Sequence, residues 1–518
     1  MAEHNDTLPT GGHGGAGSQP IAITRLIDHG YVPLRLRTPD TTFGIVAGAM
    51  DPGPDPDDGT DPKDEVDPQE NPRIPAAYTY FGQFIDHDLT FDTVSSLDTG
   101  PSKPNNERTP RLDLDCVYGL GIDSAPYMYD TKTGALLTNP NGYDLPRAGN
   151  DRAIIGDPRN DENSIVCQVQ RGFIKFHNAV VKRLIDTGKA KPGKDAFEAA
   201  RREVRLTYQA VVIHDYLVRI VADDVALAFE NDRRRLGDGA FMLYPRAKWA
   251  TLPIEFTVAA YRYGHSMIRN AYRMNTGQAH PQHIFEGEAD GKNSLVGFGT
   301  LDESHDVDWR LFLPAPSAAT APGQVMANDD DSKGRMQFAY KIDTSVVRPI
   351  AVLPSRIVGA AVLSPFAALA ARNLKRAYNF DTPSGQDVAH ALGINPLSGR
   401  DLAIRMKGGF KTFGELGIID PADVRALVEA TPLWLYVLME AQSTINRDID
   451  FEDDKHKLEP TALGPVGGRI LLEVFHGILL NDEESLLHAH NWRPMARPDG
   501  DQSQLTLWDI FVFAGEIR

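Results

Sequence analysis

The sequence contains few cysteines and no long uninterrupted apolar run. Only Cys116 and Cys167 occur among the 518 residues, which excludes a disulfide-built fold and is compatible with a reducing compartment. The longest apolar run, 357–371, has 15 residues and contains Ser364 and Pro365, whereas a membrane span needs about 20 apolar residues. We therefore expect no membrane span.

Basic residues are outnumbered, and no secretory signal is visible. Lys and Arg number 53 against 71 Asp and Glu, for a formal net charge of -18, which argues against nucleic acid or an anionic membrane as partner because both attract cations. Residues 1–20 lack a basic start followed by an apolar run. We expect the protein to be cytoplasmic, or exported by a route that leaves no N-terminal signal.

The composition divides the chain into three parts. Residues 1–20 are rich in Gly, His and Pro and predict a disordered segment. Residues 21–74 form an N-terminal extension, whose stretch 51–70 holds nine acidic residues and five prolines and predicts a surface loop without regular structure. Residues 75–518 form the main domain.

Helical periodicity dominates the main domain. Phe197, Ala200, Val204, Tyr208 and Val211 recur at intervals of three and four residues, which predicts one apolar stripe on a long helix. Alternating strand patterns are few. The sequence therefore predicts a mainly α fold with long loops and little β structure, with further helices at 165–187, 255–270, 357–377, 421–442 and 466–479.

The stretch YFGQFIDHDLTFD, residues 80–92, places charged groups in an apolar segment. On a helix, Gln83, Asp86 and His87 face one side, and Asp88 points about 100° away from His87. Buried carboxylates need a partner or a coordinated ion. From this stretch alone, both a catalytic histidine with an amide helper and a core histidine held by aspartate remain open.

Three later segments carry further polar side chains in suggestive positions. Arg159 and Glu162 lie three residues apart in GDPRNDEN, His265 follows a glycine in AAYRYGHSMIRNAY, and Asn373 and Arg376 interrupt the apolar helix LAARNLKRAYNF. Taken singly, each is more simply explained as a solvated turn or a core residue. Their joint order along the chain is the informative feature.

In that order, the segments resemble the animal haem peroxidase superfamily, and in particular its bacterial branch, over about residues 75–495. The resemblance implies a haem peroxidase-like helical domain at 75–518 in which His265 is the proximal iron ligand. Asn373 would accept a hydrogen bond from the other ring nitrogen of His265, with Arg376 supporting this layer. Arg262 would pair with a haem propionate.

On the distal side, the resemblance implies that one histidine acts first as a general base and then as a general acid. His87 would take a proton from peroxide and deliver it to the departing oxygen. Arg159 would stabilise the charge on that oxygen, and Gln83 would orient a water or halide ion.

The resemblance also implies covalent attachment of haem b. Asp86 and Glu162 occupy the positions that form ester bonds to the haem in family members of this kind, and an esterified carboxylate carries no charge to bury. Asn163 stands where the myeloid enzyme has methionine, which excludes a third, sulfonium link.

A calcium site is implied next to the distal helix. The family joins the aspartate after the distal histidine to a loop that here reads TPRLDLDCVYG. The expected oxygen ligands suit a hard cation such as calcium; they are Asp88, Thr109, the Arg111 carbonyl, Asp113 and Asp115, the last standing where the family has serine.

The implied activity is that of a peroxidase, which reduces hydrogen peroxide and oxidises halides, thiocyanate or small aromatic donors through a ferryl intermediate. A fatty-acid dioxygenase on the same fold is the first alternative, but its radical-forming tyrosine would lie at position 262. That position is Arg262, and Tyr261 and Tyr263 are displaced by one residue. The second alternative is a non-catalytic adhesion or binding protein on the same scaffold.

Overall fold

A computed structural model describes most of the chain. The described ranges are 21–53, 69–91, 105–237, 241–245, 250–277, 281–285, 294–315, 336–354, 365–406, 409–443, 462–497 and 502–517. The predicted disordered segment 1–20 and most of the predicted acidic loop, 54–68, lie outside these ranges. The division of the chain at residues 74 and 75 stays a prediction.

Helices dominate the described part of the chain. The α-helices are α1 (Pro39–Ala49), α2 (Ala77–Leu89), α3 (Asp115–Tyr118), α4 (Gly121–Ser124), α5 (Ser164–Asp186), α6 (Lys194–Val211), α7 (Leu217–Ile220), α8 (Asp223–Leu236), α9 (Arg348–Ala351), α11 (Leu369–Asn379), α12 (Gly385–Ala391), α13 (Pro421–Glu429), α14 (Leu433–Ser443), α15 (Pro465–Leu480) and α16 (Leu507–Phe513). Shorter helical turns that matter below are η2 (Pro158–Asp161), η3 (Val212–Tyr216), η4 (Glu255–Ala259) and η5 (Ala260–Met267).

Strands are short and pair only in twos within the described ranges. The antiparallel pairs are β1 (Ile21–Ala22) with β3 (Asn105–Asn106), β2 (Glu70–Pro75) with β8 (Phe338–Tyr340), β4 (Tyr129–Asp130) with β5 (Ala135–Leu136), β6 (Ala271–Tyr272) with β7 (Gln282–His283), and β9 (Ala403–Met406) with β10 (Gly409–Thr412). The prediction of a mainly α fold with little β structure is therefore confirmed.

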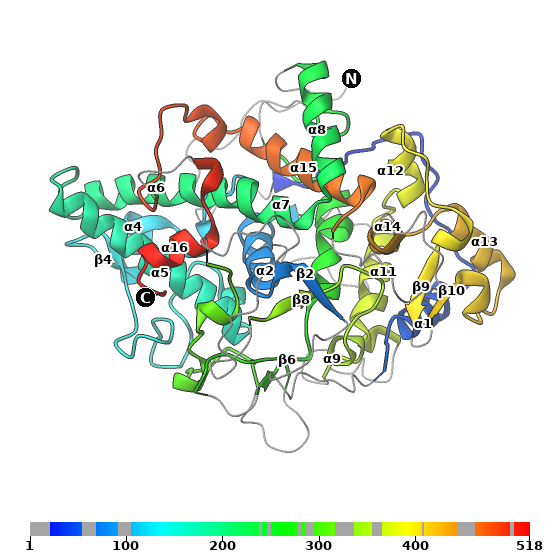
Figure 1. The fold of residues 1–518 in the computed structure, drawn as a ribbon, viewed down its shortest axis with the longest axis horizontal. Coiled ribbons are helices and arrows are strands. Elements are labelled where there is room, and N and C mark those ends of the chain that lie inside the picture. The colour runs from blue at the N-terminus through cyan, green and yellow to red at the C-terminus, as the bar shows by residue number, and fades with distance from the viewer. Residues whose placement is uncertain are drawn as a thin grey trace.

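Helix α2 lies in the middle of the molecule, with α5 and α6 on one side and α11 and α14 on the other (Figure 1). Its aromatic face packs on α5 and α6. The rings of Phe84 and Phe173 stack at 4.8 Å, and Phe81 meets Tyr208 edge-on at 6.1 Å. Such aromatic pairs add directional contacts to the burial of apolar surface, so α2 is held firmly at the centre.

The predicted apolar stripe on the long helix is confirmed by α6. Its five members, from Phe197 to Val211, are all buried. After Val211 the helix continues through η3, a π turn, into α7. A π turn is a local widening of a helix that shifts the following side chains, and Tyr216 stands at its end.

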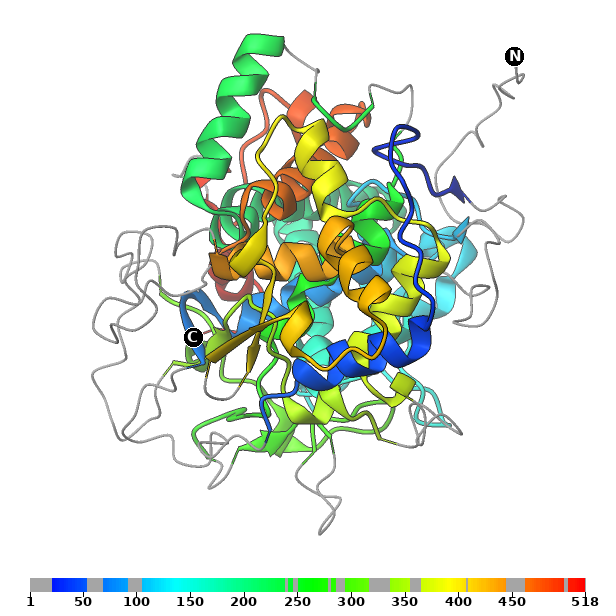
Figure 2. The same cartoon turned by 90° about the vertical axis from the view of Figure 1, so that its right-hand side faces the viewer.

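The other half of the molecule contains α1, α11, α13 and α14, and Figure 2 views it directly, with α1 in blue on its outer side. Phe43 of α1 and Tyr378 of α11 meet edge-on at 5.6 Å. Strand β2 pairs with β8. The described part of residues 21–74 therefore packs against the rest of the chain.

The predicted C-terminal boundary of the acidic loop, residue 70, is wrong. Glu70, assigned to the loop by composition, begins β2 and is buried. Its Oε1 lies 2.7 Å from Nη1 of Arg269, and this buried ion pair offsets the cost of desolvating the carboxylate.

Three of the predicted helices differ from expectation. The pattern at 357–377 lies outside the described residues up to 364, and the described part is a short 3-10 turn, Pro365–Ala367, followed by α11. The pattern at 421–442 is two helices, α13 and α14, because Pro432 cannot donate a helical hydrogen bond and interrupts them. The pattern at 255–270 is a π turn, η4, followed by a 3-10 helix, η5. Short apolar spacings of three and four residues do not distinguish these helix types. No described helix is both long and apolar enough to cross a membrane.

Candidate active site

Helix α2 presents its polar side chains in two directions. Gln83 and Asp86 keep part of their surface accessible, His87 is nearly covered, and Asp88 is fully buried. This division agrees with the helical spacing, because Asp86 and His87 lie three and four residues after Gln83, whereas Asp88 lies five residues after it. The polar side chains of α2 therefore lie in two separate environments.

His87 is held by an asparagine that the sequence reasoning missed. Its Nδ1 lies 2.7 Å from Oδ1 of Asn160, and Nδ2 of Asn160 donates to Oε1 of Gln170 at 2.8 Å. The other ring nitrogen, Nε2, lies 3.9 Å from Oε1 of Glu162. Asn160 stands between Arg159 and Glu162 in the sequence, so only its position beside two site residues could have drawn attention to it.

Glu162 lies next to both Gln83 and His87. Nε2 of Gln83 donates to Oε1 of Glu162, and Oε1 of Gln83 accepts from Nδ2 of Asn163 at 3.1 Å. Burial raises the pKa of Glu162 and the charge of His87 opposes this, yet 37% of the side chain remains accessible. The carboxyl is thus surrounded by protein but borders open space.

Arg159 is anchored by an aspartate on its own turn. Asp157 caps η2, accepting from the Arg159 backbone, and its Oδ2 receives Nη2 of Arg159 at 2.8 Å. Nη2 also donates to the carbonyls of His87, at 3.1 Å, and Thr90. Nη1 has no hydrogen-bond partner among the described residues. Arg159 therefore bridges η2 to the end of α2 and keeps one nitrogen free.

The ionisation of Asp157 is strongly favoured. Burial raises its pKa, but the hydrogen bond and charge of Arg159, with the charge of Arg108, outweigh burial and lower the pKa to about 2. Arg108 Nη2 lies 2.6 Å from Oδ2 of Asp157. Neither Asp157 nor Arg108 carried a recognisable signal in the sequence.

His265 lies on η5 and contacts helix α11. Its Nδ1 is 2.9 Å from Nδ2 of Asn373, and its Nε2 has no partner in the described part of the chain. Burial and the nearby charge of Arg262 lower the pKa of His265 to about 3, so the imidazole is neutral. If Nε2 binds a metal, Nδ1 carries the proton and the Asn373 amide presents Oδ1, since the two amide ends are interchangeable by rotation.

Arg262 lies near His265, and Arg376 lies near Arg262. Burial, then the charge of Arg376, lowers the pKa of Arg262 to about 10, and Asp86 opposes this. Nε of Arg262 donates to the Thr257 carbonyl at 3.1 Å. Arg376 lies over the ring of Phe380 at 5.7 Å. The pair supplies positive charge, which suits an anionic ligand group.

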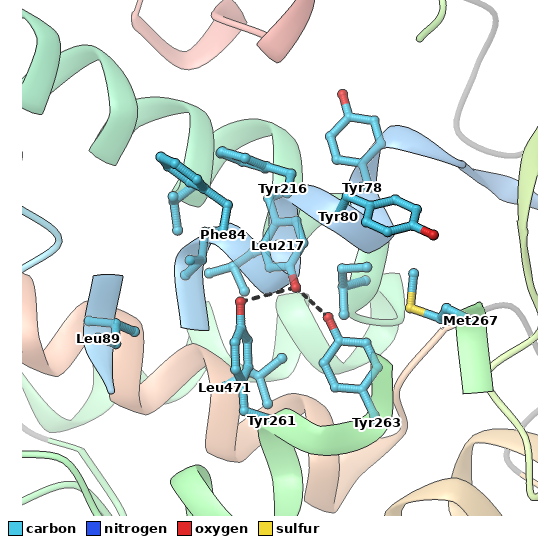
Figure 3. Close-up of a cluster of buried hydrophobic side chains, with 14 of the residues drawn as sticks. Tyr78, Tyr80, Phe84, Leu89, Tyr216, Leu217, Tyr261, Tyr263, Met267 and Leu471 are labelled. Carbon is cyan, nitrogen blue, oxygen red and sulfur yellow. Dashed lines mark hydrogen bonds between the residues drawn. The ribbon is translucent and has the colours of Figure 1, made fainter. Parts of the chain in front are cut away.

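The tyrosines that flank Arg262 both contact a third tyrosine, Tyr216. Figure 3 shows the hydroxyl of Tyr216 between those of Tyr261 and Tyr263, at 3.1 and 2.6 Å. Tyr261 also donates to the Gly82 carbonyl at 3.2 Å. All three hydroxyls are therefore engaged with one another between α2 and η5.

The predicted calcium ligands come together in part. Carboxylate oxygens of Asp88, Asp113 and Asp115 lie within 4.8 Å of one another. Both carboxylate oxygens of Asp88 and Oδ1 of Asp113 are buried, and none of them has a hydrogen-bond partner among the residues that the structure describes. Burial, then the charge of Asp113, raises the pKa of Asp88 to about 7. Three crowded carboxylates with unpartnered oxygens fit a hard cation.

The remaining predicted ligands are occupied by protein contacts. Oγ1 of Thr109 donates to Asp113 at 2.8 Å, and the Arg111 carbonyl accepts from Gln209 at 3.2 Å. Arg108 donates to Asp115 at 3.1 Å. A carbonyl or hydroxyl oxygen retains a second lone pair, so these contacts do not prevent ligation.

Comparisons with known proteins concern both sequence and fold. The sequence profile described as animal haem peroxidase matches residues 94–297. The chain is 26% identical to Peroxidase mlt-7 of Caenorhabditis elegans over 184 residues, which are 33% of this chain and 24% of that protein. It is 27% identical to Chorion peroxidase of Aedes aegypti over 202 residues, 36% and 25% of the two chains. The chain therefore spans about a quarter of the length of these relatives.

Solved structures share the fold over nearly the whole chain. Peroxidase A from Dictyostelium discoideum superposes with a TM-score of 0.57 at 12% identity, covering 96% of this chain and 93% of that one. Fatty acid alpha-dioxygenase of Oryza sativa gives 0.52 at 14% identity, covering 97% and 80%. The fold is thus common to both enzymes, whereas the match to the animal haem peroxidase profile covers residues 94–297, a range that includes Arg159 and His265.

Proposed function

We propose that this protein is a peroxidase that binds haem b through Nε2 of His265 and reduces hydrogen peroxide on the side where His87 lies. One observation carries the proposal. Two histidines from distant parts of the chain each have Nδ1 against an asparagine side chain and Nε2 without a hydrogen-bond partner among the described residues. The haem, when bound, supplies the electrons that reduce peroxide and then recovers them from a donor.

The residues around His265 fit a haem. A neutral imidazole is the form that ligates iron, and a hydrogen bond at its other nitrogen fixes its orientation. Arg262, half-buried and cationic, would pair with a propionate. Asp86 and Glu162 both border accessible space and would form the ester bonds to the haem edge.

The distal residues divide the proton transfer and the charge stabilisation between them. Nε2 of His87 would accept the proton of the peroxide oxygen nearer the iron and deliver it to the other oxygen as the O–O bond breaks, which typically contributes about 10²- to 10⁴-fold. The free Nη1 of Arg159 would stabilise the departing oxygen. Gln83 would orient a water or halide ion. The donors we propose are halides, thiocyanate or small aromatic molecules.

Calcium would occupy the site made by Asp88, Asp113 and Asp115, with Thr109 and the Arg111 carbonyl as further ligands. The unpartnered oxygens of Asp88 support this proposal. Because Asp88 follows His87 in α2, the cation would also hold the end of the distal helix.

The dioxygenase alternative has less support. It requires a tyrosine that can become a radical next to the haem, but Arg262 stands at the position where the dioxygenases have that tyrosine. The hydroxyls of the neighbouring Tyr261 and Tyr263 are hydrogen-bonded to Tyr216. A non-catalytic scaffold would not need His87, Arg159 and His265 together.

Absorption spectroscopy tests the proposal. Purified protein supplied with haem should show a Soret band that shifts on adding peroxide and returns on adding a reductant. His265→Ala should lose iron ligation, and His87→Gln should retain haem but lose peroxide turnover by at least about 10²-fold. The control is His390→Gln, at an exposed histidine of α12, which should behave as the unchanged protein. Absence of a haem band would refute both enzyme functions.

A second experiment tests the ester bonds. Acidified organic solvent should leave haem attached to the unchanged protein after exposure to peroxide, and should extract it from the double variant Asp86→Ala, Glu162→Ala. Equal extraction from both would refute covalent attachment.

A further inference from the structure

We propose that Asn160 and Gln170 are positioning residues that hold His87 as the tautomer protonated on Nδ1, which leaves Nε2 free to accept a proton. The inference rests on the proposed function, because it names the groups that prepare the base for that reaction. Neither residue lies in the set expected to touch haem or peroxide.

The three side chains form one buried chain of hydrogen bonds. Nδ1 of His87 is 2.7 Å from Oδ1 of Asn160, and Nδ2 of Asn160 is 2.8 Å from Oε1 of Gln170. All three residues are buried, so water does not compete for these contacts. An amide oxygen only accepts, and therefore Nδ1 of His87 must be the donor.

Gln170 determines which end of the Asn160 amide faces His87. With Oε1 of Gln170 accepting from Nδ2, turning the Asn160 amide alone would bring two oxygens together and present an NH₂ group to Nδ1. Both partners stand on rigid supports, since Asn160 lies in η2, tied to α2 by Arg159, and Gln170 lies within the long helix α5. The chain is therefore pre-organised before any ligand binds.

The charged groups around His87 do not set its tautomer. Glu162 lies on the Nε2 side, at 3.9 Å, and Arg159 contacts the His87 backbone carbonyl. Asp157 is held by Arg159 and Arg108. Within the described part of the chain, none of these groups bonds to Nδ1, so the hydrogen bond to Asn160 is the one that fixes the position of the proton.

Tautomer control has a direct consequence for the reaction. In the opposite tautomer, Nε2 carries a proton and cannot accept one from peroxide. Loss of the group that fixes the histidine tautomer in a serine protease lowers kcat by about 10⁴-fold. The effect here should be smaller, about 10- to 100-fold, because a released imidazole still adopts the correct tautomer part of the time.

The first experiment reads the tautomer itself. Full-length protein carrying ¹⁵N-labelled histidine is examined by NMR as purified. Where haem is bound, the protein is brought to the diamagnetic ferrous carbonyl state. The His87 signal is assigned as the one that is missing from the spectrum of His87→Gln. We expect the shift pattern of an Nδ1–H imidazole in the unchanged protein and a mixture of tautomers in Asn160→Ala. An Nε2–H imidazole in the unchanged protein, as when both amides are turned, would overturn the inference. The result does not depend on turnover, so it stands even if the proposed function fails.

The second experiment compares matched variants in haem-loaded protein. Asn160→Ala and Gln170→Leu should slow both peroxide reduction and cyanide association, which also needs a base for the proton of HCN, while the haem spectrum persists. Asn160→Asp, which restores an acceptor at Nδ1, should recover most of the rate.

Gln168→Leu is the control for the loss of a buried amide. Gln168 is also buried on α5, but it donates to the Tyr143 carbonyl and not toward His87. Its rate should equal that of the unchanged protein. A loss in Gln168→Leu equal to that in Gln170→Leu, or full rates in Asn160→Ala, would contradict the assigned roles.

Discussion

The hydroxyl oxygen of Tyr216 occupies the space beside the α-carbon of Gly82. A β-carbon on Gly82 would lie 2.5 Å from that oxygen, closer than real contacts allow. Tyr216 is fixed from the other side by Tyr261 and Tyr263. Because Gly82 precedes Gln83 in α2, the absence of a side chain at this position lets η3 approach the helix that carries Gln83 and His87.

Gly82→Ala should therefore destabilise the protein. We expect a loss of about 1–3 kcal/mol in the free energy of unfolding, since overpacking outweighs the gain in helix propensity of roughly 1 kcal/mol. Urea unfolding measures it. Adding Tyr216→Phe, which removes the clashing oxygen, should recover part of the loss, so the double variant should be less destabilised than the sum of the two changes. The matched control is Gly48→Ala in α1, where a β-carbon meets nothing within 4 Å.

Asn373→Leu should weaken haem binding. The variant leaves Nδ1 of His265 without its partner, which lies at 2.9 Å. Loss of such a contact typically costs 10- to 100-fold in affinity or activity at a metal site. We therefore expect haem to transfer to excess apomyoglobin about 10- to 100-fold faster from the variant than from the unchanged protein. Asn373→Asp keeps an acceptor and should retain haem, with a more negative iron reduction potential. Equal haem transfer from the leucine and aspartate variants would show that the contact does not support the ligand.

The sequence predicts local relationships well and long-range ones poorly. Gln83, Asp86 and His87 share a short helix, so periodicity alone places them on one face. Asn160 and Gln170 matter only because η2 and α5 fold against α2, and nothing within their own segments indicates this. The π and 3-10 turns at 255–267 were missed because a few apolar spacings fit several helix types. Pro432, in contrast, was a visible signal for the break between α13 and α14.

Asp88→Asn should have opposite effects with and without calcium. Burial and the charge of Asp113 raise the pKa of Asp88 to about 7. The stability associated with protonated Asp88 is present below the unfolded pKa of about 4 and is lost as the pH rises through the folded value. In chelator, above that pH, we expect Asp88→Asn to be more stable than the unchanged protein, on the order of 2 kcal/mol, because asparagine carries no charge to bury.

Added calcium should reverse that order. A ligand that binds only the folded state stabilises it by about 2.7 kcal/mol at one hundred times its dissociation constant. The unchanged protein should gain this increment, and Asp88→Asn should gain less, having lost one carboxylate ligand. Urea midpoints with chelator and with excess calcium measure both effects. A calcium response that is the same in both proteins would place the ion elsewhere.

Stability should fall in mild acid partly because of His177. Its ring is buried in α5 between the Tyr118 hydroxyl and the Gly134 carbonyl, each at 3.1 Å. Burial lowers the pKa of His177 to about 4, and the bond to Gly134 opposes this. Since the folded pKa lies below the unfolded value of about 6.5, this contribution is present above pH 6.5 and is lost as the pH falls toward 4, amounting to about 3 kcal/mol.

His177→Gln keeps a donor and an acceptor but cannot titrate. Plotted against pH over this window, its free energy of unfolding should therefore be less steep by up to about 1.4 kcal/mol per pH unit, whereas His390→Gln should follow the unchanged protein. Identical slopes for all three proteins would show that His177 is not protonated on unfolding.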